Sequence, residues 1–466
     1  MRKLPLILAL LAVLLSTATA IAQESQTQAD FRGEATRFKQ SCEGFTFKKI
    51  PGCADLLFTD HPLHIAVGSI APQNGFGAGG AYVGHYTPNE LWRTSWDADA
   101  IASDNASWRA GFYFKAIHTP IEKIKVVTTT SGPAAHSNLS VHPYTVFNLA
   151  AQSISLNQLF YYGLGPNSVK ANATVFGMTE TIAGTDAIVP VLHSLNASLL
   201  GEVNGRFVNL RGNHSESSSS IEQLFTEASA PGLATQPPFA QLGEGLRLEP
   251  TLLNDHLQID YLAQFQQYVA PSNDHYSFRR YTFDLDHTIP LYHNAASYGP
   301  MPTNGPDECA ASPGATKCSA IQRNREGSVE VRLLITESIA SAGSVVPFYF
   351  QPTLGGSDIN GNSWLPSYSD YRFRAPNALL LREAFEHSIW GPIGFAFSAD
   401  EGKVALSRNK IDFNQLAHSF SAGITLRAGG LPALSLAFAW GGPEGTHTIA
   451  NVDTSLLGGS TRPSLF

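Results

Sequence analysis

Short segments of alternating apolar and polar residues recur along most of this sequence, and they constrain its fold more than any other feature. In residues 279–291, Phe283 and Leu285 alternate with Thr282 and Asp284. The same pattern occurs in residues 256–269, 328–336, 418–428 and 433–441. Successive side chains of a strand point to opposite faces, so each segment predicts a strand with one apolar and one polar face. The repetition predicts an all-β, antiparallel fold.

A transmembrane β-barrel accounts for these segments better than a soluble β-sandwich. The polar faces carry charges of both signs, as a wet lumen would, and many apolar faces end in aromatic residues, as interfacial girdles do. The alternating region covers 55–466, and about 25 residues per strand and connection would give about 16 strands. We therefore predict an outer-membrane barrel, with a secreted soluble β-sandwich protein as the distant alternative.

The beginning of the sequence predicts export. Arg2 and Lys3 precede an apolar run over 4–15, and the small residues of Ala20-Ile21-Ala22 are typical of a cleavage site before Gln23. The run is too short to span a bilayer as a helix. We interpret 1–22 as a signal peptide and 23–54 as a short polar leader in the periplasm.

Four cysteines form two local pairs, Cys42 with Cys53 and Cys309 with Cys318. In an oxidising compartment each pair is predicted to close a disulfide, with free thiols as the alternative. Neither pair has the spacing of a metal site, so no metal and no cofactor are expected. The net charge of −8 argues against nucleic acid as a partner.

Two connections, 211–247 and 294–325, are much longer than the others. We expect both to be outer loops, because periplasmic turns of such barrels are short.

The last third of the chain carries several motifs in a recognisable order. These are Leu354-Gly355-Gly356, Trp390-Gly391-Pro392-Ile393-Gly394, Asp400-Glu401-Gly402-Lys403-Val404, Gly423-Ile424-Thr425-Leu426-Arg427 and the aromatic Phe466. In this order they resemble the barrel of the bacterial surface antigen family, the BamA/TamA-type outer-membrane proteins. The family's periplasmic docking (POTRA) repeats are each longer than 23–54, so none is expected here.

The resemblance implies a plug-like loop, 354–370, that enters the lumen and contacts the strand holding Asp400. The loop residues implied are Gly355, Gly356, Asn360 and Gly361. Asn360 stands where the family has an Arg, so a bond from it to Asp400 would be neutral and weaker. Arg372 or Arg374 could reach inward instead.

The resemblance also implies a weak seam between the first strand, about 63–85, and the last strand, about 433–441 or 450–466. Its candidate residues are Gly75, Gly77, Gly79, Gly80 and Phe466, because glycines weaken a strand.

We therefore predict a barrel, not an enzyme, that assists insertion or translocation of polypeptides by adding client strands at the seam. Its partners would be outer-membrane lipid, client polypeptides and a separate periplasmic protein. The alternative is a passive pore or a structural surface barrel.

Overall fold

The computed structural model describes residues 62–89, 91–119, 144–213, 218–253, 256–297, 321–390, 393–428, 431–452 and 463–465, together with Arg32 and Thr36. The predicted signal peptide, most of the predicted leader, all four cysteines and Phe466 lie outside the described residues. The two disulfides therefore remain predictions.

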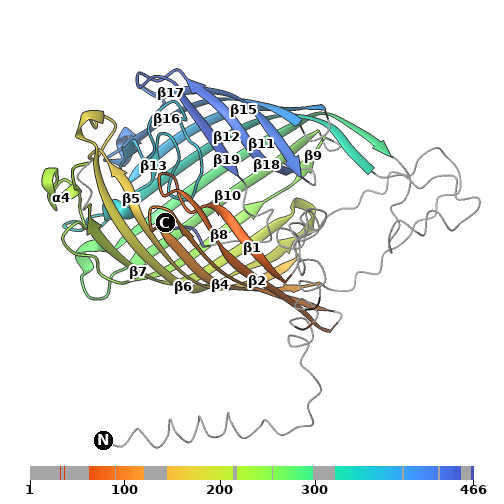
Figure 1. The fold of residues 1–466 in the computed structure, drawn as a ribbon, viewed down its shortest axis with the longest axis horizontal. Helices are drawn as coiled ribbons and strands as arrows, with labels where there is room; N and C mark the ends of the chain where they lie inside the picture. Colours follow the sequence, from red (N-terminus) through yellow and green to blue (C-terminus); the bar gives the residue numbers. More distant parts are fainter. Residues whose placement is uncertain are drawn as a thin grey trace, which may run out of the picture.

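Within the described residues, seventeen strands form one antiparallel sheet that curves into a barrel (Figure 1). They are β1 (Leu63–Ser69), β2 (Phe76–Asn89), β3 (Trp92–Ser103), β4 (Trp108–His118), β5 (Thr145–Tyr161), β6 (Thr174–Leu192), β7 (Ala197–Gly212), β8 (Phe239–Leu248), β9 (Thr251–Leu252), β10 (Leu257–Val269), β11 (Phe278–Ser297), β12 (Ile321–Ala340), β15 (Asn377–Trp390), β16 (Ile393–Ala405), β17 (Ala417–Ala428), β18 (Leu431–Trp440) and β19 (His447–Val452). From β1 to β8 and from β10 to β19, each strand of this sheet pairs with the next one along the chain, and β8 and β9 pair with successive parts of β10. When β8 and β9 are counted as one strand, the number of strands agrees with the predicted number of about 16.

The remaining elements are short. A two-stranded sheet joins β13 (Thr353–Leu354) to β14 (Phe373–Arg374). The helical segments are α4 (Ile221–Leu224), η1 (Lys170–Asn172), η2 (His193–Leu195), η3 (Asp274–Tyr276), η4 (Phe348–Phe350) and η5 (Arg408–Lys410). In the part of the chain described, no helix is long and apolar enough to cross a membrane.

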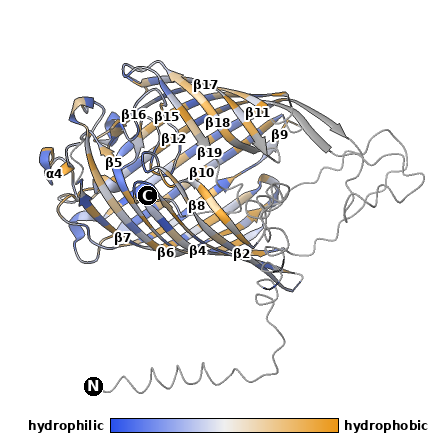
Figure 2. Cartoon of the chain, viewed as in Figure 1, coloured by the Kyte–Doolittle hydropathy of each residue, from blue (hydrophilic) through white to orange (hydrophobic). Residues whose placement is uncertain are grey.

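The alternation in the sequence becomes an outer and an inner face of the barrel. Leu436 and Phe438 of β18 are 55% and 51% exposed, whereas Ser419 of the neighbouring β17 is fully buried. Figure 2 shows apolar and polar residues alternating along the strands. Lipid offers polar groups no hydrogen-bond partners, so the face of a barrel that lipid covers consists of apolar side chains.

Successive antiparallel strands place their connections at alternate ends of the barrel. The connections 213–238, 270–277, 341–376, 406–416 and 441–446 share one end, here called the loop end. β11 therefore ends, and β12 begins, at the opposite end, where β6 also ends and β7 begins. Our expectation that 211–247 and 294–325 are both outer loops is wrong, because three strand passes lie between them: β8 with β9, β10 and β11.

An aromatic cluster fills the interior at the loop end. Phe348 and Phe350 of η4 are fully buried. Their rings lie 5.0 Å from Tyr161 and 5.0 Å from Phe239 respectively. Arg280 of β11 donates to the Phe350 carbonyl and Arg374 Nη1 donates to the Phe348 carbonyl (2.7 Å). These bonds satisfy backbone groups that burial would otherwise leave unpaired.

Candidate functional site

The segment between β12 and β15 leaves the wall and folds back along its inner face. β13 pairs with β14 at its base, and the turn at Gly355 and Gly356 has positive φ angles of 102° and 59°. A side chain at Gly356 would lie 2.4 Å from Asp370 Oδ1, so this position requires glycine. We call residues 353–374 the lumenal loop.

Asp400 anchors the middle of the lumenal loop to β16. Its Oδ2 accepts the Leu365 N–H (3.0 Å), and its two oxygens accept Arg382 Nε (2.7 Å) and Nη2 (2.6 Å). Arg382 also donates to the Ser363 carbonyl and lies 4.6 Å from the centre of the Trp364 ring. A fully buried carboxylate is thus paired, and a bidentate arginine fixes its orientation.

Asn360 does not bond Asp400. It lies at the tip of the lumenal loop, where Asp358 Oδ1 accepts the N–H groups of Asn360 and Asn362 (both 2.9 Å). The Asn360 Oδ1 accepts the Leu465 N–H (2.9 Å). Gly361, with a φ of 86°, completes this turn.

The two nearby arginines have other partners. Arg372 donates to Glu444 in the β18–β19 turn and to the Ser168 Oγ (2.7 Å) and carbonyl (2.6 Å). Arg374 bonds the Phe348 carbonyl, as described above. Neither bonds Asp400; the arginine that does so, Arg382, was missed by the sequence reasoning.

The lumenal loop also holds the first and the last hairpins of the barrel. On one side, Gln73 Nε2 donates to Asp370 Oδ2 (2.6 Å) and Tyr371 Oη donates to the Pro72 carbonyl (2.9 Å). On the other side, the Gly442 N–H donates to Ser367 Oγ (3.0 Å). These residues, with Ser369, Arg372 and Glu444, form a clasp across the seam.

Glu444 is the charged centre of the clasp. It accepts the Ser369 N–H (3.1 Å) and hydroxyl (3.0 Å) as well as Arg372, and Lys170 Nζ lies 3.4 Å away. Burial raises the pKa of Glu444, but the bonds from Arg372 and Ser369 outweigh it and hold the pKa below its ordinary value.

The seam itself is a cleft between β1 and β19. In the described strands, the register pairs of β1 join it to β2 and those of β19 join it to β18. A cleft of about 930 Å³ lies here, lined by Ser69, Thr448 and Ala450 and by the loop tip.

The predicted seam glycines lie beside the cleft edge. Gly75 forms the turn after β1 with a φ of 77°. Gly77, Gly79 and Gly80 belong to β2, which pairs with β1 on one side and β3 on the other. A side chain at Gly79 would lie 1.9 Å from the Ala100 carbonyl, so this glycine permits close approach to β3. The predicted first strand, 63–85, is two strands, because a turn at 70–75 divides it.

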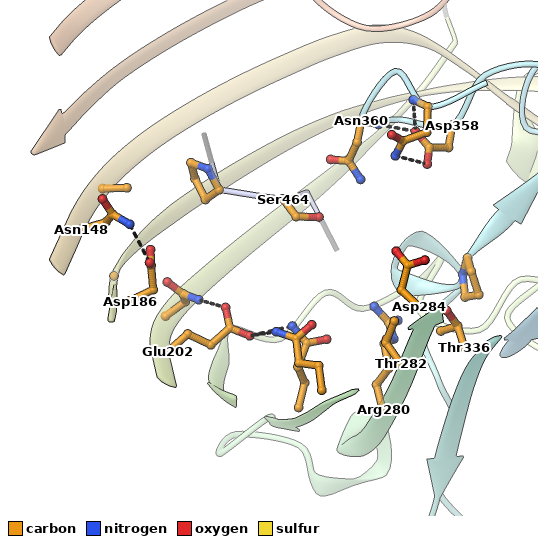
Figure 3. Close-up of a pocket in the computed structure, with 18 of the residues that line it drawn as sticks. Asn148, Asp186, Glu202, Arg280, Thr282, Asp284, Thr336, Asp358, Asn360 and Ser464 are labelled. Carbon is orange, nitrogen blue, oxygen red and sulfur yellow. Dashed lines mark hydrogen bonds between the residues drawn. The ribbon is translucent and has the colours of Figure 1, made fainter. Parts of the chain in front are cut away.

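A second cavity, of about 610 Å³, occupies the lumen beside the loop tip (Figure 3). Asn148, Asp186, Glu202, Arg280 and Asp284 point into it from four strands of the wall. Glu202 accepts bonds from Gln241 (2.9 Å), Gln264 (3.2 Å) and Gln266 (2.6 Å). In the described residues, no three His, Cys, Asp or Glu side chains converge as a metal site.

The comparisons with known proteins describe the fold. A scan of protein-family models found no match, and a search of curated proteins found none either. Among solved structures, the chain is similar to CdiB from Acinetobacter baumannii, with a TM-score of 0.43 and 10% identity over 84% of this chain and 59% of that one. It is also similar to BamA from Haemophilus ducreyi lacking POTRA domains 1–3 (0.44, 11%, 84% and 69%) and to CdiB from Escherichia coli (0.46, 12%, 84% and 62%).

The fold resembles BamA and CdiB barrels. The chain spans about three fifths to two thirds of the length of these structures.

Proposed function

We propose that this protein is an outer-membrane barrel that accepts polypeptide strands at the seam and so assists their insertion into, or passage across, the membrane. The observation that carries the proposal is the pair of strand edges facing the seam cleft. Within the described residues, β1 and β19 each use one edge for pairing, with β2 and β18. An unpaired edge presents N–H and C=O groups that can pair with an added strand.

The two faces of the barrel support a membrane location. β17 and β18 expose large apolar side chains, including Ile424 at 54% and Leu436 at 55%. The lumen carries buried ion pairs such as Glu180 with Arg206. The partners proposed are therefore outer-membrane lipid and a client polypeptide. The loop end would face outward, with the leader and a separate periplasmic partner at the opposite end.

A passive pore is the competing function, and the filled interior at the loop end argues against it. The aromatic cluster around η4 and the lumenal loop occupy the loop end of the lumen. A wide channel for solutes would need that space. The role proposed is non-enzymatic.

Locking the seam tests the proposal. Cysteines at Ser69 and Ala450, both lining the cleft, are joined with a bismaleimide after the four native cysteines are changed to serine. The control joins Ser398→Cys to Ser421→Cys, where the hydroxyls of two paired strands lie 2.8 Å apart. The probe is the same chain unfolded in urea and added to proteoliposomes, with protease protection as the readout.

The seam cross-link should abolish the acceleration of client insertion, whereas the control cross-link should leave it intact. Equal insertion with and without the seam cross-link would overturn the proposal. Absence of any acceleration, together with a large conductance in planar bilayers, would favour the passive pore.

A further inference from the structure

Residues 463–465 lie inside the barrel, against the lumenal cavity. Pro463 and Ser464 line this cavity together with residues of β5, β7 and β10 (Figure 3). Leu465 is only 5% exposed and belongs to the apolar cluster at the loop end. This segment follows β19 in the chain but takes no part in the described sheet.

Two backbone groups of the segment are bonded to the lumenal wall and the lumenal loop. Arg206 Nη2 donates to the Ser464 carbonyl (2.8 Å), and the Leu465 N–H donates to Asn360 Oδ1 (2.9 Å). Main-chain groups are common to all residues, so these bonds recognise an extended peptide with little regard to its sequence. Selectivity comes from the apolar surroundings of Leu465.

Arg206 and Asn360 each have contacts besides those with the segment. Arg206 is 2% exposed and uses Nη1 for Glu180 (2.7 Å) and Nε for Gln241, which leaves Nη2 directed at the peptide carbonyl. The Asn360 backbone N–H donates to Asp358 Oδ1, which holds the turn that carries the Asn360 side chain. A side chain held by partners of its own, as Arg206 is, loses little entropy on binding.

We propose that the lumen contains a binding site for a short, extended peptide with an apolar residue, and that residues 463–465 are its intramolecular occupant. The cavity of about 610 Å³ beside the segment leaves room for a longer peptide. Such a volume lies within the range of pockets that enclose small ligands. The site exists whether or not strands add at the seam.

Competition in trans tests the site. The probe is a fluorescent synthetic peptide of residues 460–466, and its anisotropy is measured with the purified protein in detergent. A chain lacking residues 463–466 should bind the probe saturably. The complete chain should bind it at least about tenfold more weakly, because its own segment occupies the site.

Matched peptides identify the contacts. N-methylation at the position of Leu465 removes the N–H that Asn360 accepts, and should weaken binding about tenfold. Equal binding of the N-methylated and parent peptides, or no gain on removing 463–466, would overturn the inference.

A second measurement tests the site without the truncated chain, in case that chain fails to fold. In the full-length protein, a photo-reactive benzoylphenylalanine at Ser464 should cross-link to β7, β8 or residues 358–362. Cross-links confined to detergent or to exposed connections would contradict a lumenal site.

Discussion

The wall from β5 to β12 and the seam between β1 and β19 are held together by different means. Strands β5, β6, β7, β11 and β12 have 17, 19, 16, 20 and 20 residues, and cross-strand ion pairs line their inner face. By contrast, β1 and β19 have seven and six residues within the described part of the chain. There the lumenal loop joins the two hairpins through side chains, so a few substitutions can weaken the seam while the wall stays intact.

The largest effect is expected where the lumenal loop is anchored. Arg382→Ala leaves Asp400, which is 0% exposed, without its cation, and should lower the free energy of unfolding by about 3–5 kcal/mol. Urea titration of refolding into liposomes measures this. The control Arg408→Ala removes the exposed pair with Glu337 and should cost about 0–1 kcal/mol. Similar losses in the two variants would contradict the anchor.

The next effect separates the two faces of the wall. Leu436→Arg places a charge on the lipid side of β18 and should cost about 2–4 kcal/mol near the middle of the bilayer. Ser435→Arg, one residue earlier, points to the cleft and should cost far less. The same refolding titration compares them. Equal costs would mean that the lipid face is misassigned.

A smaller effect is expected at the clasp. Glu444→Gln removes the anion paired with buried Arg372, at a cost of about 1–3 kcal/mol to the closed seam. The cysteine at Ala450 should then react faster with a soluble thiol reagent. Lys170→Gln is the control: its side chain is 49% exposed, so its loss should change the rate little.

The smallest effect is a pH dependence of the clasp. The folded state lowers the pKa of Glu444, so its stabilisation is complete above its ordinary pKa of about 4.5 and is lost as the pH falls through the folded value. Hydrogen exchange of 441–446, corrected for the intrinsic rate, should therefore rise in acid. Glu444→Gln should remove this rise; if it persists, another group is responsible.

The strands of the wall could be predicted from the sequence, because a two-residue period can be recognised without knowing the register between strands. The pairing of Arg382 with Asp400, which anchors the lumenal loop, could not be predicted in this way. The hairpin between β15 and β16 contains an irregularity between Ser388 and Trp390 that shifts the register, and this shift sets Arg382 opposite Asp400. Local sequence does not determine such a shift. The division of 63–85 into two strands depended likewise on the turn at Gly75.

The aromatic cluster at the loop end affects the exchange of solutes between the lumen and the surrounding medium. With Phe348 and Phe350 fully buried there, aromatic side chains fill the lumen at the loop end. A solute in the lumen would have to displace these rings before it could leave at the loop end.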